Sequence, residues 1–144
     1  MTAQILLDTN VVSELMRRDP DPGVLAWFDL YKDAEFVISS IVRSEILLGI
    51  ALLPDGERKR KLTSAATAMF EEDFEVCLPF DAKCANTYAD LVAGRMHAGQ
   101  PISTEDGQIA AIALTSRLPL ATRNTKDFAN IAGLAVLNPW EHAP

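Results

Sequence analysis

The sequence predicts an α/β protein, organised as a three-layer α/β/α sandwich around a central, mostly parallel sheet of about five strands. Short aliphatic runs alternate with longer segments of helical spacing along the whole chain. The first run, residues 5–7, is continuously apolar, which is typical of a strand buried on both faces of a parallel sheet. With 144 residues and no linker or internal repeat, the chain is predicted to form a single domain, residues 1–144.

Strands are predicted at the short apolar runs, residues 5–7, 36–39, 74–78, 118–121 and 134–137. Helices are predicted between them, at residues 11–16, 23–31, 41–53, 57–72 and 81–98, and from a cap at Ser103 or Thr104 through the apolar body 109–114. Pro20 and Pro22 end the first helix, because neither donates a backbone hydrogen bond. The helix over 81–98 is expected to turn five side chains inward: Cys84, Tyr88, Leu91, Val92 and Met96.

Composition bounds the function only loosely. Apolar residues make up 49% and charged residues 23% of the chain, as in an ordinary globular protein. The net charge of −7 gives no overall attraction to nucleic acid, so a phosphate-binding surface would have to be local. Cys77 and Cys84 have no metal-binding spacing and are expected to be free thiols. With no signal peptide and no long apolar run, a soluble, cytoplasmic protein is expected.

Acidic residues recur just past the predicted strands or in the first turns of the helices that follow. They are Asp8, Glu45, Asp106 and Asp127. Each has an ordinary explanation, because acids cap helices, favour the positive end of the helix dipole or lie solvated on a helix surface. The carboxyl ends of parallel strands meet at one edge of the sheet, however, so we also expect the four carboxylates to converge there.

Convergence of these carboxylates has a chemical consequence. Without a counter-charge they repel one another, which raises some of their pKa values. Their oxygen atoms suit Mg²⁺ or Mn²⁺, ions that lower the pKa of a bound water and neutralise charge on a phosphoryl group. The chain has no Ser-His-Asp or Cys-His arrangement and no Walker loop, so the sequence favours metal-assisted hydrolysis over covalent catalysis.

Four motifs occur in a specific order. Asp8-Thr9-Asn10 follows an aliphatic strand, Glu45 lies early in the third helix, residues 106–111 read DGQIAA, and residues 122–128 read TRNTKDF. Together they resemble a PIN-domain ribonuclease, and most nearly the VapC and FitB-like toxins of bacterial toxin–antitoxin pairs. The resemblance covers essentially the whole chain and implies a PIN-like fold.

The resemblance implies a role for each matching position. Asp8 and Asp106 would be the principal metal ligands, for Mg²⁺ or, as the alternative, Mn²⁺. Glu45 would complete the acidic pocket, and Asp127 would contribute through water or a second metal. Four further residues would position the pocket from the first and last loops: Thr9, Asn10, Thr122 and Asn124.

It also implies a reaction and partners. The reaction would be endonucleolytic cleavage of RNA by metal-activated water. The protein would form a homodimer, join a cognate antitoxin in a heterotetramer or larger complex, and reach operator DNA only through that antitoxin, with no membrane involved. An antitoxin arginine would enter the acidic pocket, and the groove for the antitoxin is expected at Leu15, Met16, Trp27 and Phe28.

Three alternatives bear on this interpretation. A phosphatase of the haloacid dehalogenase type needs a second aspartate where this chain has Asn10, and a receiver domain needs acid pairs that are absent. The third is a PIN-like module that binds protein or nucleic acid with little catalysis. For an RNA enzyme of net charge −7, we expect Arg43, Arg123 and Lys126 to supply local positive charge near the pocket.

Overall fold

The structure is a computed structural model that describes residues 3–141, so the ends of the predicted domain, residues 1–2 and 142–144, lie outside the described residues. Its five strands form one sheet in the order β3-β2-β1-β4-β5, and all pairs are parallel. This confirms the predicted α/β class. The sheet, which was predicted to be mostly parallel, is fully parallel. The strands are β1 (Gln4–Leu7), β2 (Glu35–Ser39), β3 (Cys77–Leu78), β4 (Leu120–Ala121) and β5 (Val136–Leu137).

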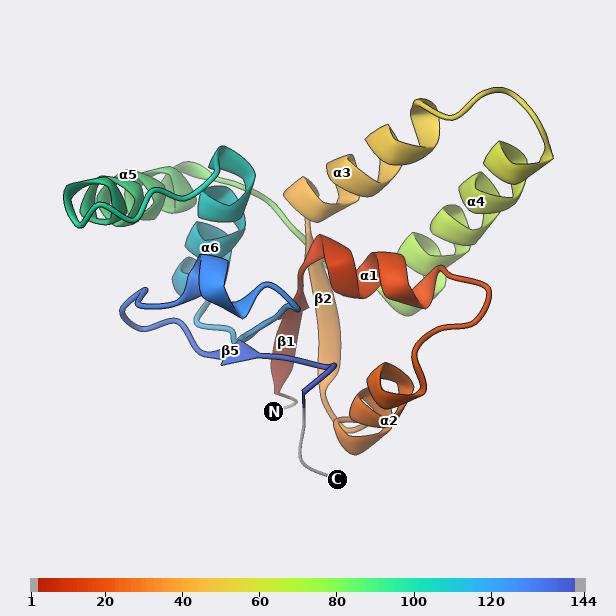
Figure 1. Cartoon of the computed structure of the whole chain (residues 1–144), viewed down its shortest axis with the longest axis horizontal. Coiled ribbons are helices and arrows are strands. Elements are labelled where there is room, and N and C mark those ends of the chain that lie inside the picture. Colours follow the sequence, from red (N-terminus) through yellow and green to blue (C-terminus); the bar gives the residue numbers. More distant parts are fainter. Residues whose placement is uncertain (1–2, 142–144) are drawn as a thin grey trace.

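Six α-helices cover the two faces of this sheet (Figure 1). They are α1 (Thr9–Leu15), α2 (Pro22–Leu30), α3 (Ser40–Ala51), α4 (Glu57–Ala68), α5 (Ala82–His97) and α6 (Thr104–Ser116). In Figure 1, α1 to α4 lie to the right of β1 and β2, and α5 and α6 lie to the left. Two short helices complete the described chain, the π-helix η1 (Met69–Asp73) and the 3₁₀-helix η2 (Thr125–Phe128).

The strand order places a topological switch point at β1. The chain adds β2 and β3 on one side of β1, and then crosses over to add β4 and β5 on the other side. Right-handed crossovers in opposite directions put the two helix groups on opposite faces, as observed. A crevice therefore opens past the carboxyl ends of β1 and β4, where ligands bind in sheets of this kind.

Polar side chains start the helices at this edge of the sheet. Asp8 caps α1, Ser39 caps α3 through a 3.1 Å bond from the Val42 amide, and Ser103 caps α6 by accepting from the Asp106 amide. Each satisfies a backbone N–H that has no partner within its helix. Because Asp8 is the cap, α1 begins at Thr9, two residues before the predicted start.

The core lies on both faces of the central strands. Leu6, Leu7, Val37, Ile38 and Leu120 are fully buried, as the continuous apolar runs predicted. The body of α6, residues 109–113, is also fully buried, because small apolar residues occupy all sides of this helix.

Some predicted boundaries are wrong. The predicted strand 74–78 pairs only at Cys77–Leu78, because α4 ends at Ala68 and the chain continues as η1, which buries Met69 and Phe70. The predicted strands 118–121 and 134–137 likewise shorten to two paired residues each, β4 between β1 and β5, and β5 at the edge of the sheet.

Two side-chain placements are also wrong. Met96 was expected to point inward from α5, but it is exposed to 65% near the end of that helix. Trp27 was expected to line an antitoxin groove, but it is buried among the rings of Phe28, Tyr31 and Phe36. Within residues 3–141, no helix combines the length and the apolar composition that crossing a membrane requires.

Candidate active site

Asp8 lies at the centre of the site, directly after β1. Its amide donates to the carbonyl of Ala121 at the end of β4 (2.9 Å), which fixes the residue at the switch point. Its Oδ1 accepts from the backbone amide of Thr9 (2.8 Å). Its Oδ2 accepts from the hydroxyl of Thr122 (2.7 Å) and, in a longer bond, from the side-chain amide of Asn10 (3.3 Å). The side chain is therefore both a helix cap and the hub of a buried polar network.

Asn10 and Thr122 join the first and last loops of the site. The Asn10 side chain donates to Thr122 Oγ1 (3.2 Å) and accepts from the Arg123 amide (3.1 Å). Thr122 Oγ1 also accepts from the backbone amide of Asn124 (3.1 Å). Two of the predicted positioning residues thus hold Asp8 by their side chains, whereas Asn124 contributes its main-chain amide.

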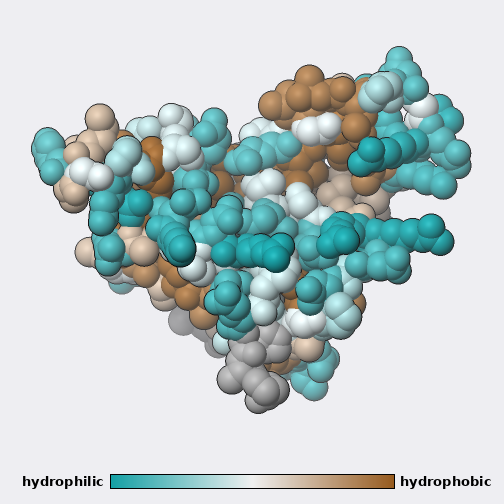
Figure 2. All heavy atoms as spheres, in the orientation of Figure 1, coloured by the Kyte–Doolittle hydropathy of each residue, from teal (hydrophilic) through white to brown (hydrophobic). Residues whose placement is uncertain are grey.

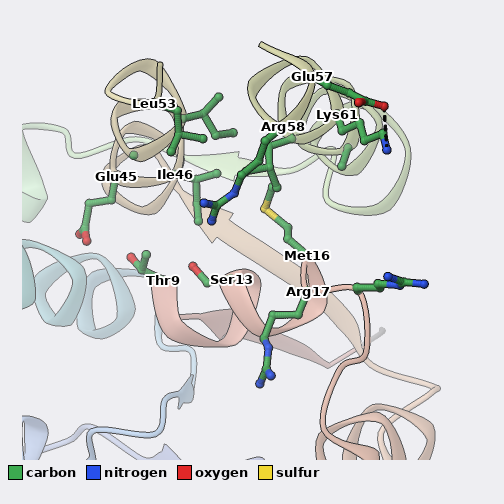
Figure 3. A pocket seen from close by; sticks show the side chains of 15 residues that line it. Thr9, Ser13, Met16, Arg17, Glu45, Ile46, Leu53, Glu57, Arg58 and Lys61 are labelled. Carbon is green, nitrogen blue, oxygen red and sulfur yellow. Dashed lines mark ion pairs between the residues drawn. The ribbon is translucent and has the colours of Figure 1, made fainter. Parts of the chain in front are cut away.

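Glu45 reaches the site from the second turn of α3. Figure 3 shows its carboxylate beside the hydroxyl of Thr9, which projects from the first residue of α1. Glu45 is half-buried, and the Thr9 hydroxyl beside it is fully buried. The interaction of this hydroxyl with the Glu45 carboxylate lowers the pKa of Glu45, against the larger effect of burial.

Asp106 and Asp127 approach from the opposite face of the sheet. Asp106 lies in the first turn of α6, where the Ser103 cap holds its amide at 3.2 Å, and it is half-buried. Its neighbour Glu105 is exposed, in agreement with the prediction that only Asp106 turns toward the buried face. Asp127 is an exposed residue of η2, just past β4.

The pKa directions show that these carboxylates act on one another. Burial is the main cause that raises the pKa of Asp8, and Asp127 adds to it, while bonds from Thr122, Thr9 and Asn10 oppose it. Burial likewise raises the pKa of Glu45, with Asp8 and Asp106 adding repulsion. Burial and then Asp8 raise the pKa of Asp106, and Asp127 contributes too. The electrostatic coupling links all four acids and supports the predicted convergence.

The donor set fits a hard divalent cation, although it does not form a closed cage. Within the described part of the chain, no three His, Cys, Asp or Glu side chains lie close enough together to hold a metal ion by themselves. None of the three ion pairs among those residues includes one of the four acids. Asp8, Glu45 and Asp106, which are buried or half-buried and have raised pKa values, suit Mg²⁺, which takes one or two carboxylates and completes its shell with water and phosphate.

The three basic residues predicted near the pocket lie in different surroundings. Lys126 is exposed on η2, next to Asp127. Arg123 lies over the ring of Trp140, with 5.0 Å between its guanidinium carbon and the ring centroid. Arg43 lies 4.7 Å over the ring of Phe70, beside the Cys77 thiol, so its guanidinium is directed at η1 and β3.

Sequence reasoning missed one large feature beside the site. A groove of about 1100 Å³ runs between α1, α3 and α4, and Thr9 and Glu45 lie at one end of it (Figure 3). Its apolar lining includes Met16, Ile46 and Leu53, and cations such as Arg58 stand along it. Arg58 and Lys61, from the basic run of residues 58–61, also line this groove.

Comparisons with known proteins agree with this geometry. The model of the PIN-domain family matches residues 5–134. The chain is 43% identical to the plasmid stability protein StbB of Pseudomonas syringae pv. tomato, over 95% of this chain and 99% of that one. It is 38% identical to the VapC ribonuclease Y4jK of Sinorhizobium fredii (96% and 99% covered) and 39% identical to the toxin FitB of Neisseria gonorrhoeae (94% and 98%).

Solved structures give the same result. A structure of FitAB bound to the IR36 DNA fragment superimposes with a TM-score of 0.87 at 37% identity, covering 97% of this chain and 98% of that one. The structure of VapBC2 from Rickettsia felis, bound to a DNA fragment from its promoter, gives a TM-score of 0.79 at 28% identity, covering 94% and 98%. The chain therefore belongs to the PIN-domain family, among its VapC- and FitB-like toxins.

Proposed function

We propose that this protein is a metal-dependent endoribonuclease and the toxin of a cytoplasmic toxin–antitoxin pair. The observation that carries the proposal is the electrostatic coupling of Asp8, Glu45, Asp106 and Asp127 at the switch point, where no ion pair within residues 3–141 neutralises them. The names of two relatives, a VapC ribonuclease and the toxin FitB, support it.

Asp8 is the residue best placed to hold a cation. Two carboxylate oxygens offer about four acceptor positions. Three are used by Thr9, Thr122 and Asn10, and Oδ1 makes only one of these bonds. Oδ1 therefore retains acceptor capacity in a carboxylate whose direction is fixed, so little conformational entropy is lost when it binds an ion.

The other three acids would also contribute to binding the cation. Asp106 is the second proposed ligand, since it is half-buried and electrostatically coupled to Asp8. Glu45 and Asp127 would hold ordered water or a second ion, and the buried Thr9 hydroxyl would orient the Glu45 carboxylate. A bound Mg²⁺ or Mn²⁺ would lower the pKa of its water and stabilise charge on the phosphodiester. The four side chains, in turn, would hold and orient both reactants.

The groove beside the site suits an antitoxin segment. Its apolar lining would bury one face of an amphipathic helix, and its cations would meet acidic side chains on the rim. Arg17 and Lys61 already pair with Glu14 and Glu57, whereas Arg18 and Arg58 are in no ion pair among the described residues. We propose this groove, rather than one built on Trp27 and Phe28, as the antitoxin seat. An arginine from that segment would neutralise the acids at its end.

A second contact surface lies on α3. Leu47, Leu48 and Leu52 are exposed to 45%, 59% and 75%, and Figure 2 shows the apolar surface that they form over this helix. Exposed apolar residues grouped in this way mark protein contacts. We propose this patch as part of the homodimer interface. Operator DNA would be reached only through the antitoxin. In support of DNA binding by such a complex, FitAB and the VapBC2 complex of Rickettsia felis have both been solved bound to DNA fragments.

The test is RNA cleavage by the antitoxin-free protein. A structured RNA pool is incubated with Mg²⁺, Mn²⁺ or EDTA, using the wild type, Asp8→Asn, Asp106→Asn and the control Asp29→Asn, whose carboxylate is exposed on α2. We expect metal-dependent cuts that vanish in the first two variants and persist in the control. Removing one such ligand typically costs orders of magnitude in rate.

Two other outcomes would overturn the proposal. Cleavage that persists in both site variants would place the activity elsewhere. A folded, metal-loaded wild type that cuts no RNA, yet still forms a complex with its antitoxin, would favour the PIN-like binding module.

A further inference from the structure

Arg95 ties together two segments that each lead to a site carboxylate. This residue lies in the last turn of α5, and the N–H groups of its guanidinium donate to three backbone carbonyls. Nε donates to Gln100 (2.7 Å), Nη1 to Ala129 and Nη2 to Asp127 (3.2 Å). The five N–H donors of arginine form a planar fork, so one side chain can hold several carbonyls in a fixed arrangement.

The segment of η2 depends on this contact for its position. Asp127 is exposed, no hydrogen bond of its carboxylate is found among the described residues, and its amide bonds only locally, to the Asn124 carbonyl. Phe128 anchors η2 in the core, being 1% exposed, and the bond from the Asn124 amide to Thr122 Oγ1 holds the start of η2. Across the 32 residues that separate them, Arg95 adds a further attachment near the other end of η2 by donating to the Asp127 carbonyl.

The Gln100 contact extends the effect to Asp106. Gln100 lies three residues before Ser103, the cap that holds the Asp106 amide, and its own amide donates back to the Arg95 carbonyl (2.8 Å). The loop that leads into α6 and the loop that carries Asp127 therefore share one cation. A cation beside the terminal carbonyls of the short helix η2 is also favoured by the helix dipole.

We infer that Arg95 is a positioning residue, which sets the place of Asp127 relative to Asp8 and Asp106 by holding the Asp127 and Ala129 carbonyls. The inference rests on the proposed function. Arg95 touches no reacting atom, and its effect passes entirely through η2 and the loop at Gln100. Loss of the fork lets Asp127 move away, which weakens metal binding more than it weakens the fold.

The test compares Arg95→Met, Arg95→Lys and the control Arg60→Met, whose side chain is exposed on α4. Mn²⁺ affinity is measured by calorimetry, and amide hydrogen exchange is followed over residues 124–130. We expect Arg95→Met to weaken Mn²⁺ binding several-fold and to speed exchange in this segment. Arg95→Lys should recover part of both, because an ammonium can serve one or two of the carbonyls. The control should match the wild type.

A double variant separates positioning from general damage. If Arg95 acts through Asp127, Arg95→Met in an Asp127→Asn background should weaken Mn²⁺ binding no further, so that the two effects are not additive. Equal losses in both backgrounds, or unchanged exchange over residues 124–130, would overturn the inference. A wild type that binds no Mn²⁺ would instead count against the proposed function, and the exchange data alone would then decide whether Arg95 holds η2.

Discussion

The hydroxyl of Thr122 donates a 2.7 Å hydrogen bond to Oδ2 of Asp8, joining residues 114 positions apart at the ends of β4 and β1. Both residues are buried, Thr122 completely. The bond stabilises the charged form of a carboxylate whose pKa burial raises. Thr122 thus offsets part of the free-energy cost of burying the charged Asp8 carboxylate at the switch point.

Removing this hydroxyl should raise the pKa of Asp8. In Thr122→Val the carboxylate loses its shortest bond, so the acidic limb of the pH–rate profile for RNA cleavage should move to higher pH. Stability should fall by about 1 to 3 kcal/mol, the usual cost of a lost bond to a charged group. Thr122→Ser keeps the hydroxyl and should keep the profile. The prediction fails if Thr122→Val retains the wild-type acidic limb in its pH–rate profile.

The apoprotein should lose stability as the pH rises above about 4, where unfolded carboxyls ionise. Burial raises the folded-state pKa values of Asp8, Glu45 and Asp106, so above that pH the folded chain holds more protons than the unfolded chain. Stability then decreases until the pH has passed through the raised pKa values. Asp81 has the opposite shift, caused mainly by the Cys84 amide, and its contribution is lost only below this window.

Calorimetric melting of the apoprotein at pH values from about 4.5 to about 8 tests whether stability falls as the pH rises. Mg²⁺ should restore the lost stability at neutral pH, by about 2.7 kcal/mol at one hundred times its dissociation constant. Because protons compete for the same oxygens, the gain should shrink toward the acidic end. A melting temperature that rises steadily with pH in the absence of metal would contradict the assignment.

Asp106→Asn should stabilise the apoprotein while abolishing cleavage. The substitution removes a half-buried charge that Asp8 and Asp127 repel, and it keeps the backbone amide that Ser103 caps. Solvent screening limits the gain to about 0.5 to 1 kcal/mol. Glu105→Gln is the matched control, since it removes an exposed charge from the same turn. Urea unfolding should show a gain for the first variant only, and a loss in both would refute the repulsion.

The sequence predicted those parts of the fold that depend on local patterns of residue type. The continuous apolar run 5–7 and the body 109–114 predicted buried elements, and residues 5–7 and 109–113 are buried. A cap at Asp8 and one at Ser103 or Thr104 were expected from the residue types, and the caps are Asp8 and Ser103. The segment 74–78 was misassigned because its apolar residues look like a strand, whereas only two of them pair with β2 and Phe74 closes the π-helix.

The site itself could be predicted only as a set of residues. The four acids were named from their places after strands, but their coupling across the two faces of the sheet depends on strand order, which one sequence does not contain. The same holds for contacts over long separations, such as Arg95 with Asp127. The groove was missed because its lining comes from three helices, each of which shows only a few apolar positions.

The contact between α5 and α6 should be sensitive at Gly107. A Cβ there would lie 2.9 Å from Cε2 of Tyr88 and 3.0 Å from Cγ2 of Val92, so α6 would have to shift in Gly107→Ala. Stability should fall by about 1 to 3 kcal/mol. Cleavage should fall as well, because Asp106 is the preceding residue. Gly94→Ala on α5 meets nothing within 4 Å and should be stabilising. Equal melting temperatures for the two variants would contradict the close packing.

Gly49 offers a way to fill the groove from α3. It lines the groove, and a Cβ at this position meets nothing within 4 Å. Gly49→Ala should stabilise the helix by about 1 kcal/mol and leave partner binding intact. Gly49→Trp should fill the space between α3 and α4 and weaken antitoxin binding, because the seat is then occupied. RNA cleavage by the isolated protein should be unchanged in Gly49→Ala, since the added methyl group meets no neighbour. Affinities from calorimetry, with growth during co-expression as a second readout, check this. Full binding by Gly49→Trp would move the antitoxin seat to another face of the molecule.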